Sequence, residues 1–360
     1  MIKMSVPSHN GKLIKLLILS VLLYSITAGC KGKTWVAAKP PPNLYKITAQ
    51  NLHGVDTVGT DRIWAVGSYG GIFHSMDGGK SWARQVSRSE NLLCAVYFVN
   101  ENLGWASGIY GTVLHTEDGG KNWVRQNTGT GEHLFDICFV NKDVGWTVGM
   151  GTILHTTDGG KTWAQQREKE DVNLNAVCFL DENTGWVVGE FGRIYHTTDG
   201  GKSWIQQKPP TLFVNEDDPW GDVPLALYGV TFVDKNRGWV IGISGLLLRT
   251  DDGGKTWTDL RDELNTEAPF YDIEFKGNLG WIVGGCGSYL LTQDHGKTWK
   301  LLEDVIKTRF WLHGISFTGS SKGWIVGARG AVVKTEDGGI TWTMLSGLTY
   351  DVPEYGLTDF

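Results

Sequence analysis

The stretch GWVVGEFGRIYHTTDGGKSW, residues 185–204, recurs in related form seven times along this 360-residue chain. Each copy ends in the motif [Ser/Thr]-x-Asp-x-Gly-x-x-Trp, and a second tryptophan stands about eighteen residues before the first. The motif aspartates, 40 to 53 residues apart, are Asp77, Asp118, Asp158, Asp199, Asp252, Asp294 and Asp337. The upstream tryptophans are Trp64, Trp105, Trp146, Trp186, Trp239, Trp281 and Trp324. Self-similarity at a fixed period of this length indicates a repeat architecture.

Each copy predicts four short strands, which we label a to d in chain order. In the second copy they are residues 94–99, 104–108, 112–116 and 123–126, with turn residues between them. Four strands in about 41 residues, repeated seven times, predict an all-β fold, a seven-bladed β-propeller of four-stranded antiparallel blades. We place the propeller at residues 52–347, with a long insertion at 207–224 between blades 4 and 5 and a tail at 348–360.

The motif aspartates are predicted to be turn residues rather than catalytic acids. A short carboxylate that follows Ser or Thr can accept hydrogen bonds from the backbone N–H groups of the next turn. The second glycine of each motif supplies a backbone conformation with positive φ, and the tryptophan buries its ring against a neighbouring sheet. We therefore assign all seven aspartates a structural role.

The N-terminus reads as an export signal. Residues 1–29 carry three lysines and no acids, and residues 16–24 form an apolar run too short to span a bilayer. Small residues precede Cys30, which indicates lipidation of that cysteine; cleavage of an ordinary signal peptide nearby is the alternative. We assign residues 30–51 to an anchor or linker and expect an exported, membrane-anchored lipoprotein facing the periplasm, the thylakoid lumen or the cell exterior. Removing residues 1–29 changes the net charge from −6 to −9, which argues against nucleic-acid binding.

We predict neither a cofactor nor a metal site. Cys94, Cys138, Cys178 and Cys286 lack zinc-site spacing, so we expect free thiols. His74, His115, His155 and His196 occupy one strand position in adjacent blades, too far apart to share a metal ion. His53 and His313 meet where the ring closes, and a shared water, anion or metal there remains an alternative.

The repeats carry a family resemblance. The aspartate motif resembles the Asp-box of bacterial neuraminidase repeats, and the full string in residues 185–204 resembles the photosystem II stability/assembly factor family of propeller lipoproteins. The resemblance covers about residues 52–345 and implies a protein partner, a subunit of a membrane complex. In that family an arginine-rich patch is linked to partner binding, to which Arg193, Arg309 and Arg329 could contribute here.

We expect the partner to bind the face that carries the b→c turns and the d→a connectors, because repeat positions that vary on a fixed frame can encode specificity. Aromatic residues with scattered arginines suit protein recognition. The candidates are Tyr69, Tyr110, Phe191, Arg193, Trp220, Tyr228, Tyr271, Arg309, Trp311, His313 and Arg329. Trp220 lies in the long insertion, which is alternatively a tolerated surface loop.

A non-catalytic scaffold is thus our leading prediction, and the protein is not expected to be an enzyme. One alternative is a sialidase-like glycoside hydrolase or a carbohydrate-binding propeller, although the Phe-Arg-Ile-Pro signature of sialidases is missing. The other alternative is a structural or attachment module at the cell surface.

Overall fold

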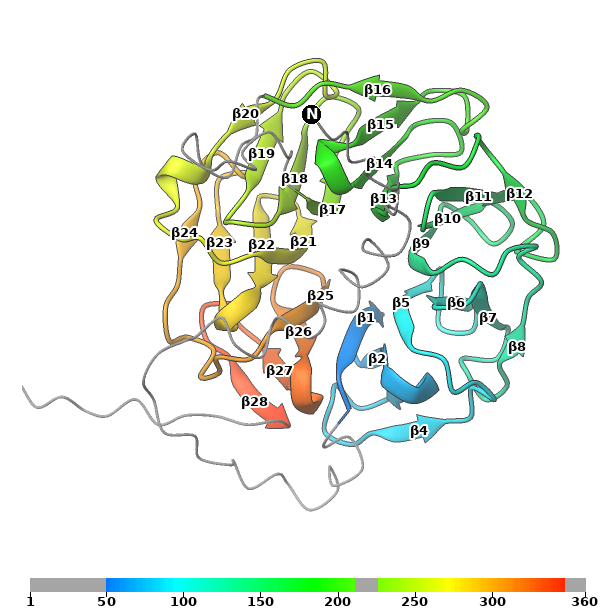
Figure 1. The fold of residues 1–360 in the computed structure, drawn as a ribbon. Helices are drawn as coiled ribbons and strands as arrows, with labels where there is room; N and C mark the ends of the chain where they lie inside the picture. The colour runs from blue at the N-terminus through cyan, green and yellow to red at the C-terminus, as the bar shows by residue number, and fades with distance from the viewer. Residues whose placement is uncertain (1–49, 211–225, 347–360) are drawn as a thin grey trace, which may run out of the picture. The chain divides into compact units, whose positions relative to one another are not determined.

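The computed structural model describes residues 50–210 and 226–346, which belong to one compact unit, residues 35–360. They form seven four-stranded antiparallel sheets, each built from four strands that are consecutive in the chain (Figure 1). The predicted seven-bladed propeller is confirmed. The predicted signal peptide, nearly all of the 30–51 segment, most of the 207–224 insertion and the 348–360 tail lie outside the described residues.

We number the blades 1 to 7 in chain order, and strands a to d of each blade run from the ring axis outward. The a strands are β1 (Leu52–Val58), β5 (Leu93–Phe98), β9 (Leu134–Phe139), β13 (Leu174–Phe179), β17 (Leu227–Phe232), β21 (Phe270–Lys276) and β25 (Leu312–Thr318). The b strands are β2 (Arg62–Gly67), β6 (Gly104–Gly108), β10 (Gly145–Gly149), β14 (Gly185–Gly189), β18 (Gly238–Gly242), β22 (Leu279–Gly284) and β26 (Lys322–Gly327).

The c strands are β3 (Ile72–Ser75), β7 (Thr112–Thr116), β11 (Thr152–Thr156), β15 (Ile194–Thr197), β19 (Leu247–Thr250), β23 (Tyr289–Thr292) and β27 (Val332–Thr335). The d strands are β4 (Ala83–Gln85), β8 (Val124–Arg125), β12 (Ala164–Gln165), β16 (Ile205–Gln207), β20 (Thr258–Asp259), β24 (Lys300–Leu301) and β28 (Thr343–Ser346). Short 3₁₀ turns are η1 (Ser68–Gly70), η2 (Glu190–Gly192), η3 (Arg261–Glu263), η4 (Gly285–Gly287) and η5 (Ala328–Gly330).

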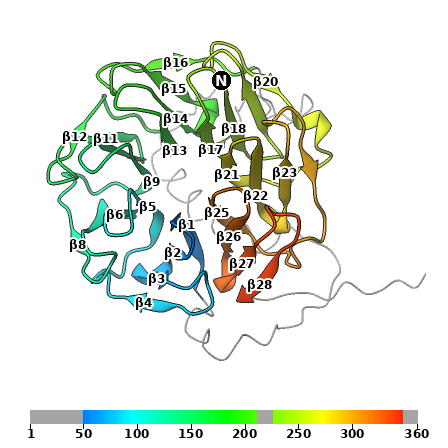
Figure 2. The same cartoon turned by 180° about the vertical axis from the view of Figure 1, so that it is seen from behind.

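The seven sheets are arranged as a ring. Each a strand contacts the a strand of the next blade, and β25 contacts β1 to close the circle. The a strands surround the axis and the d strands lie at the periphery in both views (Figures 1 and 2). Because consecutive strands are antiparallel, the b→c turns and d→a connectors emerge on one face, which we call the connector face. The aspartate turns between strands c and d lie on the opposite face.

Aromatic stacking joins each blade to the next. Trp186 of blade 4 is fully buried between His196 of its own blade, at a centroid distance of 4.6 Å, and Phe232 of blade 5, at 3.5 Å. Trp257, the motif tryptophan of blade 5, meets Phe232 edge-on at 6.0 Å. Burial of a large aromatic ring stabilises by a few kcal/mol, so these stacks hold neighbouring blades together. The four strand-c histidines are thus packing residues, each stacked on the tryptophan of its own blade.

The motif aspartates close their turns as the sequence predicts. Asp252 Oδ1 accepts hydrogen bonds from the Thr250 hydroxyl and the Thr256 N–H, both at 2.9 Å, and Oδ2 accepts one from the Thr256 hydroxyl at 2.6 Å. The side-chain and backbone donors of Thr256 lower the pKa of Asp252 to about 2. The same turn also contacts the preceding blade. The Gly253 carbonyl accepts hydrogen bonds from the indole N–H of Trp186 and from the side-chain amide of Gln207.

The junction between blades 7 and 1 departs from this pattern. Thr57 takes the place that phenylalanine holds in the other a strands, and its hydroxyl pairs with that of Ser316 at 2.9 Å. The buried indole nitrogen of Trp324 has no hydrogen-bond partner among the described residues, whereas the six equivalent tryptophans each donate to a glycine carbonyl of the next blade. This junction therefore lacks the tryptophan–phenylalanine stack and the indole–carbonyl hydrogen bond that join the other neighbouring blades.

Candidate functional site

The b→c turns of the connector face share an unusual backbone. Their second residue has a positive φ of 53° to 57° although it is not glycine; the residues are Tyr69, Tyr110, Phe191, Ser244, Cys286 and Arg329. A glycine with positive φ follows each one, which gives the geometry of a type I′ turn. Blade 3 has a shorter turn, residues 149–152, without such a residue. The position that the sequence singles out as variable is thus structurally equivalent in six blades.

Three of these residues are exposed aromatic side chains. Tyr69 is 70% exposed, Tyr110 59% and Phe191 44%, and no other aromatic residue is among the exposed large hydrophobic residues of the described chain. A bulky residue in the left-handed region costs about 1–2 kcal/mol, and glycine or asparagine would avoid most of that cost. The chain therefore keeps exposed apolar rings at positions where folding alone favours other residues.

Tyr110 is continuous with the a strand of the next blade. Its ring meets that of His133 edge-on at 5.0 Å, and the His133 Nδ1 accepts the Tyr110 N–H at 3.1 Å. His133 in turn contacts Phe135, the second residue of β9, at 6.4 Å. This row of rings leads from the b→c turn of blade 2 toward the ring axis.

A second group of rings, which we call the axial cluster, consists of His53, Tyr228, Tyr271, Trp311 and His313. Ring centroids are 5.7 Å apart between Tyr228 and Tyr271, 5.8 Å between Tyr271 and His313, and 4.8 Å between His313 and His53. Trp311 contacts Tyr271 at 5.5 Å. These rings are partly exposed and form a continuous arc over blades 5, 6, 7 and 1 at the start of their a strands. The structure thus brings together four of the predicted site residues.

Both histidines of the axial cluster are neutral. His313 Nδ1 lies 2.8 Å from the Leu52 carbonyl, to which it donates. Burial and the neighbouring His313 lower the pKa of His53 to about 3, and burial also lowers the pKa of His313. The buried Nε2 of His53 has no hydrogen-bond partner among the described residues. Neutral His313, which donates through Nδ1, therefore offers its Nε2 as a hydrogen-bond acceptor.

The a strands also carry buried carboxylates, at positions outside the set predicted from the sequence. Asp136 accepts hydrogen bonds from the Ile137 and Val177 N–H groups, and Asp272 accepts them from Ile273 and Ile315. Burial raises the pKa of Asp56, Asp136 and Glu274 to about 7 and that of Asp272 to about 6. Two of these acids could have been found by aligning the a strands of the seven copies. Asp136 and Asp272 stand at a position where the other copies have glycine or alanine.

The arginines do not form one patch. Arg193 lies on blade 4, where its Nε is 3.9 Å from Glu170 Oε2. Glu170 also pairs with Arg167 and accepts the Tyr195 hydroxyl at 2.8 Å. Arg193 is therefore part of a local ion-pair cluster.

Arg309 and Arg329 lie near blade 7 instead. Arg309 pairs with Asp304 across 3.8 Å, and the Arg329 guanidinium lies over the Phe310 ring at 4.7 Å. Phe310 directly precedes Trp311 of the axial cluster, so these two arginines lie beside that cluster. Trp220 and Cys30 lie outside the described residues.

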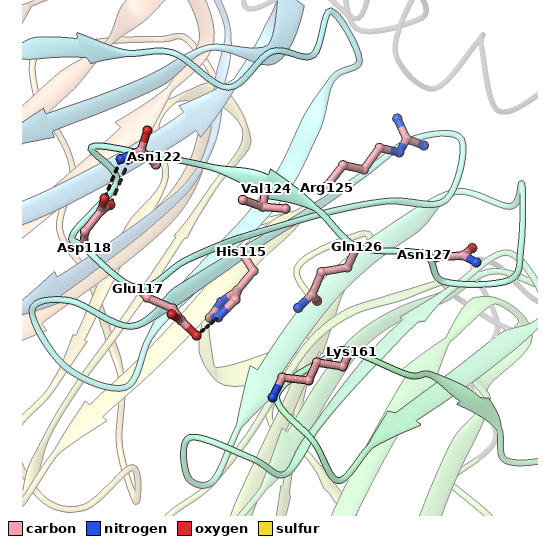
Figure 3. Close-up of a pocket in the computed structure, with 10 residues that line it drawn as sticks. His115, Glu117, Asp118, Asn122, Val124, Arg125, Gln126, Asn127 and Lys161 are labelled. Carbon is pink, nitrogen blue, oxygen red and sulfur yellow. Dashed lines mark hydrogen bonds and ion pairs between the residues drawn. The ribbon is translucent and has the colours of Figure 1, made fainter.

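A surface groove of about 590 Å³ lies between blades 2 and 3, away from the axial cluster (Figure 3). His115 and Glu117 face each other across 3.7 Å on one side of it, and Lys161 comes from the next blade. Its Gln126 amide donates to the Gly159 carbonyl at 2.8 Å, a contact that blades 1 and 4 repeat. The groove is thus lined by the repeat framework.

The described residues hold no candidate metal site and no membrane-spanning helix. No group of three or more His, Cys, Asp or Glu side chains there could hold a metal ion. No helix in the described part of the chain is long and apolar enough to cross a membrane. In the described part of the chain Cys94, Cys138 and Cys178 are free thiols; Cys138 is buried, and Cys94, Cys178 and Cys286 are partly buried.

Comparison with known proteins identifies the family. A family model described as photosynthesis system II assembly factor YCF48 matches residues 45–131, 124–209 and 215–310. The chain belongs to this family. Membership agrees with the resemblance carried by the aspartate repeats, and it extends over most of the ring.

Individual members of the YCF48 family match shorter segments. A photosystem II assembly lipoprotein Ycf48 of Prochlorococcus marinus is 35% identical over 69 residues, 18% of this chain and 20% of its own length. The chloroplastic photosystem II stability/assembly factor HCF136 of Cyanidioschyzon merolae is 36% identical over 70 residues, 16% of each chain. The matches thus span a fifth or less of these curated relatives.

A solved structure described as YCF48 bound to D1 peptide has 22% identity and a TM-score of 0.65, and the match covers 86% of this chain and 98% of that one. An ancestral GH74 enzyme has the same TM-score at 13% identity, over 87% of this chain and 48% of its own. At such identities the likeness concerns the fold alone.

Proposed function

We propose that this chain is a non-catalytic scaffold that binds a membrane-protein subunit of photosystem II during assembly, through its connector face. The observation that carries the proposal is the set of three exposed aromatic side chains held in left-handed backbone, Tyr69, Tyr110 and Phe191. Exposed rings on a rigid frame are typical anchors of protein interfaces, and their retention at strained positions needs a reason other than folding.

The partner class rests on family membership. The family model is described by photosystem II assembly, and one solved relative is described as bound to a D1 peptide. The acids of this chain favour a scaffold over a hydrolase. The aspartate of each motif is engaged by its own turn, which holds its pKa low, and Asp56, Asp136 and Asp272 accept backbone N–H groups.

The test is affinity capture. The full-length chain, immobilised and incubated with detergent-solubilised thylakoid membranes, is expected to retain one photosystem II subunit in stoichiometric amount, and a bare matrix serves as the control. Retention of no subunit would contradict the proposal. So would cleavage of a fluorogenic sialoside that a connector-face mutation abolishes, since it would restore the glycoside hydrolase alternative.

We also propose that Cys30 carries the lipid anchor after removal of residues 1–29, so that the ring faces the lumen or periplasm. The names of two matched relatives from Prochlorococcus marinus, which include the word lipoprotein, support this proposal. The variant Cys30→Ser is expected to move the protein from the membrane fraction to the soluble fraction. An unchanged membrane fraction would contradict lipid anchoring at this residue.

A further inference from the structure

We propose that the axial cluster binds a lysine or arginine side chain presented by the partner polypeptide. This inference rests on the proposed function, and it adds the chemistry of one contact. The cluster consists of His53, Tyr228, Tyr271, Trp311 and His313, as defined above. Three features of this place point to a cation rather than an anion or an apolar group.

The first feature is the arc of aromatic rings. The Tyr271 ring lies 5.7 Å from that of Tyr228 and 5.5 Å from that of Trp311, with planes tilted by 43° and 38°. All three residues keep part of their surface exposed. The face of an aromatic ring carries negative potential, and several rings together are the usual receptor for ammonium and guanidinium groups.

The second feature is charge. The seven a strands, residues 52–58 through 312–318, contain four carboxylates and a single Lys or Arg, which is Lys276. The two arginines beside the cluster have other contacts, since Arg309 pairs with Asp304 and Arg329 lies over the Phe310 ring. Lys276 pairs with Glu274 at 2.8 Å. Among the described residues no Lys or Arg forms an ion pair with Asp56, Asp136 or Asp272. Asp272 directly follows Tyr271, so the arc of rings is adjacent to a carboxylate without a counter-ion in the described part of the chain.

The third feature is the hydrogen-bonding character of the two histidines. Because His313 donates its Nδ1 proton to the Leu52 carbonyl, its other ring nitrogen is an acceptor. The buried His53 Nε2 lacks any partner within the described ranges. Lysine and arginine carry donors and no acceptors, so they match a place that offers acceptors and ring faces. Burial is the main cause of the raised pKa of Asp272, and no basic side chain of the described residues lowers it.

The experiment titrates the full-length protein with blocked tripeptides and follows the peptide side chain by NMR. Acetyl-Gly-Arg-Gly-amide and acetyl-Gly-Lys-Gly-amide are the probes, and acetyl-Gly-norleucine-Gly-amide is the uncharged control of similar length. The basic peptides are expected to bind about tenfold more tightly than the control. Their side-chain methylene signals should shift upfield, because they would lie over the ring faces.

Variants test the placement. Tyr271→Leu and Asp272→Asn are expected to weaken binding of the basic peptides about fivefold or more. Tyr271→Phe keeps the ring and should retain binding. Asp251→Asn makes the same change at an exposed loop acid and should have no effect; circular dichroism and melting temperature check that each variant folds.

The inference would be overturned if the wild-type protein bound the norleucine peptide as tightly as the basic peptides, or if the side-chain signals of the basic peptides did not shift upfield. Both results are measured on the wild-type protein, so they do not depend on whether a variant folds. Unchanged binding by folded Tyr271→Leu would overturn it as well. The outcome is separable from that of the proposed function: capture of a photosystem II subunit without basic-peptide binding refutes this inference alone. Basic-peptide binding without capture refutes the proposed partner and leaves the cation site standing.

Discussion

Replacement of the aspartate in one turn tests whether these residues hold the fold or serve binding. In Asp252→Ala the three hydrogen bonds from Thr250 and Thr256 are lost. At a partly exposed turn, where water replaces some of the lost partners, three such bonds are together worth about 1–2 kcal/mol of the free energy of unfolding. For a ring of this size that corresponds to a fall in melting temperature of about 2–6 °C.

Asp251→Ala is the matched control for Asp252→Ala. Asp251 precedes Asp252 in the chain and pairs with Arg249 at 2.8 Å, but its side chain is 59% exposed, so its loss should cost less than about 0.5 kcal/mol. Urea unfolding of both variants at neutral pH measures the difference. An Asp252→Ala variant as stable as Asp251→Ala would refute the turn argument. So would loss of partner binding at unchanged stability.

The effect of Asp252→Ala should also depend on pH. The pKa of Asp252 is lowered to about 2 in the folded protein, below its ordinary value near 3.8. The stabilisation is therefore fully present above about pH 4 and is lost as the pH falls toward 2. The wild type and the variant should differ by a constant amount from pH 5 to 8 and converge below pH 4. A difference that persists undiminished at pH 2 would contradict the role of the ionised carboxylate.

Other contacts of the ring give three more expected outcomes. Tyr69→Asn should raise the free energy of unfolding by about 0.5–1 kcal/mol, because asparagine tolerates positive φ and the exposed ring buries little surface; loss of stability in urea unfolding would contradict this. Since burial raises the pKa of Asp136 above its unfolded value, wild-type stability should fall relative to Asp136→Asn by up to about 1.4 kcal/mol per pH unit between pH 4 and 7, and parallel pH profiles of urea unfolding would argue against it. Amide hydrogen exchange should be faster in strands β1 and β25, beside the incomplete junction, than in β9 and β13, and uniform exchange would contradict a weaker junction.

The sequence predicts the ring well because every blade makes the same contacts with the same types of residue. Fourteen tryptophans and seven aspartate motifs mark the same contact in every blade, so strand number, strand order and turn position follow from the period. The predicted strand 104–108 agrees with β6 to the residue. Strands at the blade edges are shorter than predicted, since β8 keeps two residues of the predicted 123–126.

The candidate site was harder to predict because it depends on departures from the repeat. The sequence places Tyr69 and Arg329 at one turn position, but it does not reveal that both adopt left-handed backbone. The sequence also does not show which blades contact each other through aromatic side chains. The aromatic contacts of the axial cluster, from Tyr228 to His53, join residues far apart in the chain. Asp136 was missed because one acid in a short strand carries little signal until the copies are aligned.

Binding through the connector face is tested most directly by the affinity of this face for its partner after the exposed rings are removed without strain. The combined variant Tyr69→Asn, Tyr110→Asn and Phe191→Asn should be at least as stable as the wild type. The control replaces exposed Met76 and Ile340 of the aspartate turns by asparagine. With a D1 peptide in isothermal titration, we expect a loss of affinity of about tenfold or more for the triple variant and none for the control. Equal affinity of the triple variant and the wild type would contradict binding through this face.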